Sequence, residues 1–177
     1  MKLKYLAVAW GLAEATVFFI VPDVLLTFVA LQNGKRATKL CLWTLGGALV
    51  GGTIMFWWGS HDKGAAEDLL VEIPAIDLAM LEKVEGQIEE GGAKALFVGP
   101  ITGRPYKIYA VNAGGTGVSY VTFLLVSVPA RLLRFLALAW LTTAISKTLL
   151  RKKSPRFKTL LQIAIWMGFY TWYFWVM

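Results

Sequence analysis

Five apolar segments, separated by charged stretches, organise this chain. Segments of about 20 apolar residues are long enough to cross the hydrocarbon core of a bilayer as a helix. The pattern therefore predicts an all-α integral membrane protein, and nothing between the segments indicates a second domain within residues 1–177. The five segments are 5–31, 40–59, 95–113, 117–146 and 159–177.

Basic residues flank the first apolar segment on both sides. Because positively charged flanks stay on the cytoplasmic side of a membrane, we expect both ends of 5–31 in the cytoplasm. A segment with both ends on one side does not cross, so we predict a re-entrant hairpin of two half-helices, broken at Pro22. The flanking cations are Lys2, Lys4, Lys35, Arg36 and Lys39.

The stretch 62–94, which follows the span predicted over 40–59, is polar and rich in acids. Nine of the eleven acidic residues lie between Asp62 and Glu90, as is typical of a loop on the far side of the membrane. Within the stretch, apolar residues recur at helical spacing, and we expect an amphipathic helix on the outer surface. These residues are Leu78, Leu81, Val84 and Ile88.

The segment 95–113 carries helix-breaking and charged residues at its centre. Arg104 and Lys107 lie beside the breaks, and freed backbone groups are tolerated at membrane depth only against protein or a wet cavity. We therefore predict a second re-entrant hairpin, entering from outside. The expected breaks are Pro100, Gly103 and Pro105.

The remaining segments, 117–146 and 159–177, are predicted spans on either side of the basic stretch 147–158. The charge pattern places the N-terminus in the cytoplasm and the C-terminus outside. Each half of the chain then contains a hairpin followed by a span, with opposite orientations. That order is similar to the inverted repeats of secondary transporters, in which broken helices meet near the midplane.

Glu14 and Asp23 are the acids outside the polar stretch, and both lie in the first apolar segment. An ionisable group at membrane depth is costly, so it is a candidate for binding substrate or protons. The structural alternative is that these acids cap half-helices or pair with arginines. Arg131 is a further candidate because it lies nearer mid-span than Arg134. For both arginines the choice between the cavity and the cytoplasmic interface stays open.

Several function classes are disfavoured by the composition. The net charge of +7 could suggest nucleic acid, but the cations cluster beside apolar runs, where they orient helices. His61, the only histidine, has no partners in the sequence that would complete a metal site. Two carboxylates without a histidine base or a nucleophile motif give little catalytic equipment, so we expect neither an enzyme nor a cofactor.

Two motifs resemble the DedA (SNARE-associated, VTT-domain) membrane protein family, and its small YqaA-like branch in particular. Glu14 is followed by the acid of a P-x-[DE]-like turn at Pro22 and Asp23, and a later segment from Phe97 reads FVGPITGRPYKIYAVNAGG. The two arginine positions of the family motif fall on Pro100 and Tyr106, while the cations lie at Arg104 and Lys107. The resemblance covers residues 12–139.

The resemblance implies movement of lipids across a bilayer, such as polyprenyl phosphate recycling or phospholipid scrambling, in the inner membrane of a prokaryote. We expect an anionic phosphate headgroup as the partner, met by Arg104 and Lys107, which offer hydrogen bonds to phosphate. Proton coupling through Glu14 and Asp23, passive scrambling and homo-oligomerisation all stay open. Two alternatives are a proton-coupled transporter of ions or small solutes and an assembly factor that transports nothing.

Overall fold

The structure, a computed structural model, describes residues 2–176, and every regular element in that range is helical. This confirms the predicted all-α class. Met1 and Met177, the outermost residues of the predicted domain, lie outside the described residues. The elements are α1 (Lys2–Glu14), α2 (Asp23–Gln32), α3 (Gly34–His61), α4 (Lys63–Val71), α5 (Leu78–Gly91), α6 (Ala93–Val98), η1 (Gly99–Ile101), α7 (Tyr106–Gly115), α8 (Tyr120–Lys147) and α9 (Pro155–Val176).

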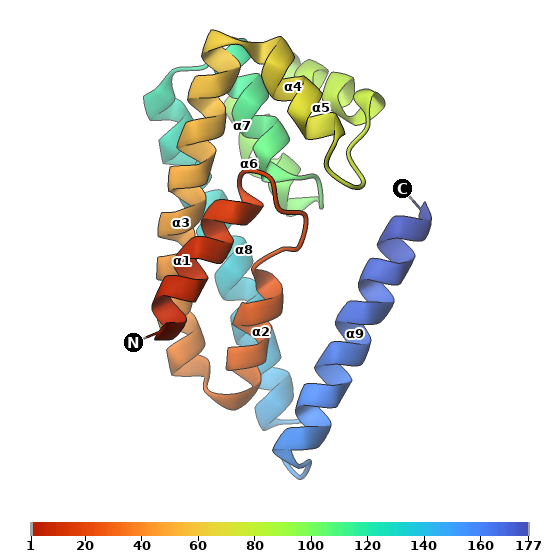
Figure 1. The fold of residues 1–177 in the computed structure, drawn as a ribbon. Helices are drawn as coiled ribbons and strands as arrows, with labels where there is room; N and C mark the ends of the chain where they lie inside the picture. Colours follow the sequence, from red (N-terminus) through yellow and green to blue (C-terminus); the bar gives the residue numbers. More distant parts are fainter. Residues whose placement is uncertain (1, 177) are drawn as a thin grey trace.

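The chain runs up and down the molecule several times (Figure 1). Helix α1 rises to about mid-height, the chain turns, and α2 returns to the end from which α1 came. The long helix α3 then runs to the far end, where α4 and α5 lie, and α6 leads back to a second turn from which α7 rises again. Helix α8 runs the length of the molecule, and α9 turns back beside α2.

Both predicted helix breaks are present, and their residues explain them. Pro22 directly precedes α2, where a proline lacking an N–H donor is tolerated at the start of a helix. The second break lies between η1 and α7. Gly103 adopts a φ of +99° there, a conformation that favours glycine, and Pro105 directly precedes α7.

Glycines allow α3 to touch both of its main neighbours. A Cβ at Gly47 would lie 2.0 Å from the carbonyl oxygen of Val8 in α1, and one at Gly59 would lie 2.1 Å from that of Val111 in α7. Both distances are far below van der Waals contact, so any side chain would separate the helices. Helix α3 therefore packs closely against both α1 and α7.

The polar stretch differs from the prediction in two respects. It forms two helices, α4 and α5, joined by a turn, and the apolar face of α5 packs against the protein instead of a membrane surface. Leu81, Val84 and Ile88 are buried in a core shared with α7, whereas Leu78 is 65% exposed. The helical spacing predicted the helix correctly, but only the tertiary structure shows that α6 and α7 pack against it.

Two helices, α3 and α8, are long and apolar enough to cross a membrane. Helix α9, the third predicted span, is long enough but less apolar, and it is not one of these two helices. Its 22 residues include Arg156, Lys158 and Gln162 together with several tryptophans and tyrosines, which lower the mean hydropathy.

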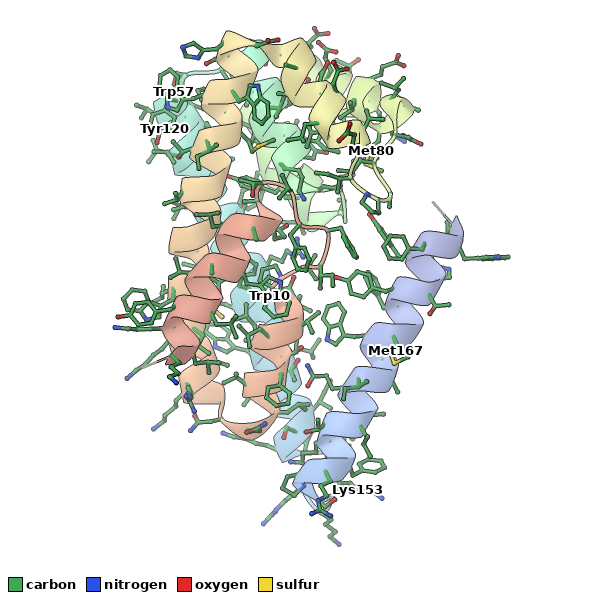
Figure 2. The ribbon with its side chains drawn as sticks, viewed as in Figure 1. Trp10, Trp57, Met80, Tyr120, Lys153 and Met167 are labelled. Carbon is green, nitrogen blue, oxygen red and sulfur yellow. The ribbon has the colours of Figure 1, made fainter. Side chains whose placement is uncertain are left out.

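Helix α9 lies at the edge of the fold. Gln162 is its one buried residue among those described, and large apolar side chains are exposed along it, such as Met167 in Figure 2. Figure 2 also shows Lys153 at the turn that joins α8 to α9. So many exposed large apolar side chains on one helix are unusual for a surface facing water.

Candidate functional site

The site is formed where the two mid-height turns approach α8. Glu14 is the last residue of α1 and Asp23 the first of α2, so the first turn brings the two acids to the same level. Both are buried, and each forms an ion pair with an arginine of α8. The arginines, Arg131 and Arg134, are three residues apart and therefore share one helix face.

Glu14 and Arg131 form a bidentate pair. Arg131 Nη1 lies 3.2 Å from one carboxylate oxygen, and Nη2 donates to the other. The guanidinium carbon is 4.7 Å from the ring centre of Tyr106 and 4.9 Å from that of Phe135. The side chain is fully buried, so Arg131 does not snorkel to an interface, and both charges depend on each other for compensation.

Asp23 and Arg134 form the second pair, with Nη2 2.5 Å from Oδ2. The carboxylate lies at the start of α2, where the helix dipole favours negative charge. Its other oxygen, Oδ1, has no hydrogen-bond partner among residues 2–176, and the Arg134 side chain is 19% exposed. This pair is therefore accessible on one side, unlike the pair of Glu14 and Arg131.

Lys107 connects the two turns. It lies in the first turn of α7, and its Nζ donates a hydrogen bond of 2.8 Å to the carbonyl oxygen of Phe18 in the loop between α1 and α2. The side chain is 2% exposed. Among the described residues it has no carboxylate within salt-bridge distance, so its charge is compensated by a dipole and by more distant acids.

Arg104 and Lys107 contact different parts of the protein. Its Nη1 is 3.4 Å from Oε1 of Gln87, an oxygen that also accepts a hydrogen bond of 2.7 Å from the Tyr109 hydroxyl. The two cations predicted to act together thus have different neighbours. Arg104 faces α5, and Lys107 faces the first turn.

A cavity of about 520 Å³ lies between α9 and the rest of the molecule. Most of its wall is apolar and aromatic, from α2, α8, α9 and the turns. Arg131 is not among the residues that line it, although it was predicted to bind substrate, and it reaches the cavity only through Glu14. The charged residues in the wall are Glu14, Asp23, Arg104, Lys107, Arg134 and Lys158, four cations and two acids.

A stripe of polar side chains on α9 lines this cavity, and the sequence analysis did not predict it. Gln162 donates to the Val24 carbonyl and, like Trp166, to the Thr27 hydroxyl, while Tyr170 accepts a hydrogen bond from the backbone N–H of Val21. Residues 162, 166 and 170 are spaced by four, which places them on one helix face. That spacing is the signal in the sequence that could have indicated the contact.

The described residues contain no group of three or more histidine, cysteine or acidic side chains that could hold a metal ion. His61 lies at the end of α3, where its Nδ1 is 2.8 Å from the Trp57 carbonyl oxygen.

No protein-family model matches this chain, and no solved structure matches it. A protein of Haemophilus influenzae, described as uncharacterized, is 28% identical to it over 126 residues. The matched region covers 71% of this chain and 65% of that relative. The chain thus spans just under two thirds of the length of a bacterial protein to which it is similar.

Proposed function

We propose that this chain is an integral membrane protein that moves a phosphate-headed lipid across the bilayer, along the cavity between α9 and the two turns. The observation that carries the proposal is the composition of the cavity wall. An apolar lining matches lipid tails, and cations that outnumber acids by four to two match an anionic headgroup.

The arrangement of the helices supports a membrane location with re-entrant hairpins. Helices α3 and α8 supply spans of sufficient length. The pairs α1–α2 and α6–α7 turn at mid-height (Figure 1), where irregular backbone needs protein around it in a bilayer. The Lys107 hydrogen bond to Phe18 gives one such contact between the two turns.

Cysteine labelling tests this topology. With Cys41 replaced by serine, we expect Asn33→Cys to react only from the cytoplasmic side and Gln87→Cys only from the outside, because one span, helix α3, separates them. A membrane-impermeant maleimide applied to right-side-out and inverted vesicles distinguishes the two. Labelling of both positions from one side would contradict the topology.

The transport step would use exchangeable charge pairs. A phosphate entering the cavity loses part of its hydration, and Arg134 and Lys107 can replace the lost hydrogen bonds. Arg134 would then bind phosphate in place of Asp23, whose carboxylate could accept a proton while unpaired. The same step would couple lipid transport to proton binding, through Asp23 more directly than through Glu14.

The proposal includes membership of the DedA (VTT-domain) family, YqaA-like branch, and a place in the inner membrane of a prokaryote. It rests on the two sequence motifs. Both acids of the first motif, Glu14 and Asp23, lie in the site described above.

Filling the cavity tests the proposed route. Leu138→Trp places a large side chain in the cavity wall, while Leu133→Trp adds the same group to an exposed position of the same helix. Overpacking costs about 1–3 kcal/mol, so we expect Leu138→Trp to slow movement of a fluorescent polyprenyl phosphate in proteoliposomes by about tenfold or more. Leu133→Trp should keep the wild-type rate.

Two results would contradict the proposal. Wild-type protein that moves neither the polyprenyl phosphate nor a fluorescent phospholipid would exclude lipid transport. Equal rates for both tryptophan variants and the wild type would exclude this cavity as the route.

A further inference from the structure

A second cavity, of about 440 Å³, lies at the end of the molecule where α2 meets α3 and α8 meets α9. Its wall combines polar side chains with three cations, and the first residue of α3, Gly34, also lines it. Backbone N–H groups at a helix start favour anions. The polar and charged lining residues are Gln32, Thr143, Ser146, Lys147, Arg151 and Lys158.

The positive charge of this cavity is uncompensated. None of its lining residues within the described chain is acidic. Two acids of the sequence, Glu14 and Asp23, are paired with arginines at mid-height. The other nine acidic residues lie within 62–90. Those nine belong to α4, α5 and their surroundings, at the opposite end of the molecule (Figure 1).

The floor of the cavity is held in place by hydrogen bonds. The buried Ser146 hydroxyl donates to the Leu31 carbonyl at 2.7 Å and accepts from Lys158 Nζ at 2.8 Å. Lys158 also donates to the Ser146 carbonyl at 3.2 Å. These bonds join α2, α8 and α9 and fix the ammonium group at the cavity wall.

From this geometry we infer that the second cavity binds a phosphate group, either on a lipid headgroup of the cytoplasmic leaflet or as free phosphate. Arginine offers paired donors to phosphate oxygens and lysine a compact charge. Lys147, Arg151 and Lys158 supply both kinds of donor around a space that is open to one side.

The two cavities share part of their walls. Leu31 and Lys158 line both. If the ligand is a lipid, a headgroup bound here would lie next to the apolar cavity along α9. The second cavity would then be the site at which a substrate binds before it is transported. That last step rests on the proposed function, whereas phosphate binding itself does not.

A matched pair of triple variants separates a built site from general basic charge. Lys147→Gln/Arg151→Gln/Lys158→Gln removes the cations of the cavity wall. Lys152→Gln/Lys153→Gln/Arg156→Gln removes three neighbouring cations that do not line it. Both variants lose the same charge from the same end, so topology and long-range attraction change equally.

Two probes distinguish the sources of phosphate. Inorganic phosphate is titrated into purified protein in detergent, and phosphatidic acid is offered in phosphatidylcholine nanodiscs. We expect the cavity triple to weaken binding of at least one probe by about tenfold or more, since hydrogen bonds to charged groups are lost, and the neighbouring triple by less than about threefold, since exposed charges interact weakly. Binding of phosphatidic acid alone assigns a headgroup, and binding of both probes assigns the phosphate group itself.

Equal losses in the two triples, or no binding of either probe to the wild type, would overturn the inference. Should the cavity triple express poorly, Arg151→Gln against Lys152→Gln repeats the comparison at two exposed side chains, with an expected difference of about fivefold. Because only binding is measured, a wild type that binds phosphate without moving lipid would contradict the proposed function and leave this site intact.

Discussion

Replacing Arg131 with methionine is expected to lower the free energy of unfolding by about 3–5 kcal/mol, because Glu14 would be left as a buried charge without its partner. Both side chains are at least 95% buried, and the guanidinium also lies over two aromatic rings. Methionine keeps most of the length of the side chain, so the loss reports mainly on the charge. Unfolding of the purified protein in detergent, followed by circular dichroism against denaturant, measures it.

Removing both charges distinguishes a structural pair from a working one. Glu14→Gln/Arg131→Met should recover most of the lost stability, since neutral groups need no buried counter-charge. If the pair is needed for transport, the stable double variant will still fail to move lipid in proteoliposomes. Normal transport by the double variant would assign both residues to structure alone, and an unchanged stability of Arg131→Met would contradict the buried pairing.

Arg134→Met is the matched control for the stability measurement. Asp23 would also lose its partner, but its carboxylate lies at the start of α2 and next to the cavity, where the dipole and water can compensate. A smaller loss than that of Arg131→Met is expected. Equal losses would mean that the second pair is as closed to water as the first.

Replacing Lys107 with glutamine is expected to slow transport of a phosphate-headed lipid by about 10- to 100-fold, the range that follows from losing one hydrogen bond to a charged group. Glutamine can still donate to the Phe18 carbonyl, so the contact between the two turns can persist. Movement of a lipid with a neutral headgroup should change little. Parallel assays of the two lipids in the same proteoliposomes give the comparison.

Arg104→Gln is the companion variant. Arg104 lines the same cavity, contacts Gln87 of α5 and is partly exposed, so we expect its replacement to slow transport less than that of Lys107. Raised salt should reproduce part of the Arg104 effect, because salt screens exposed charges more than buried ones such as Lys107. Equal losses for both lipids in Lys107→Gln would mean that the residue shapes the turn and does not recognise the headgroup.

The sequence by itself determined the helices and their breaks, because these depend on neighbours along the chain. Apolar runs predicted α3 and α8, and the prolines and glycine around Pro22 and Gly103 predicted the two breaks. The scarcity of acids in apolar segments marked Glu14 and Asp23, and the structure places both in the wall of one cavity.

Only the tertiary structure decided which charges meet. The sequence favoured Arg131 over Arg134 as a site residue, yet Arg131 is enclosed and Arg134 lines the cavity, because partner choice depends on how α8 packs against the first turn. Packing also covered the apolar face of α5 and separated Arg104 from Lys107. Contacts between residues more than a hundred positions apart leave no local pattern. The spacing within α9 could have indicated its polar stripe, but neither the partners of that stripe nor the ion pairs could be derived from spacing within one segment.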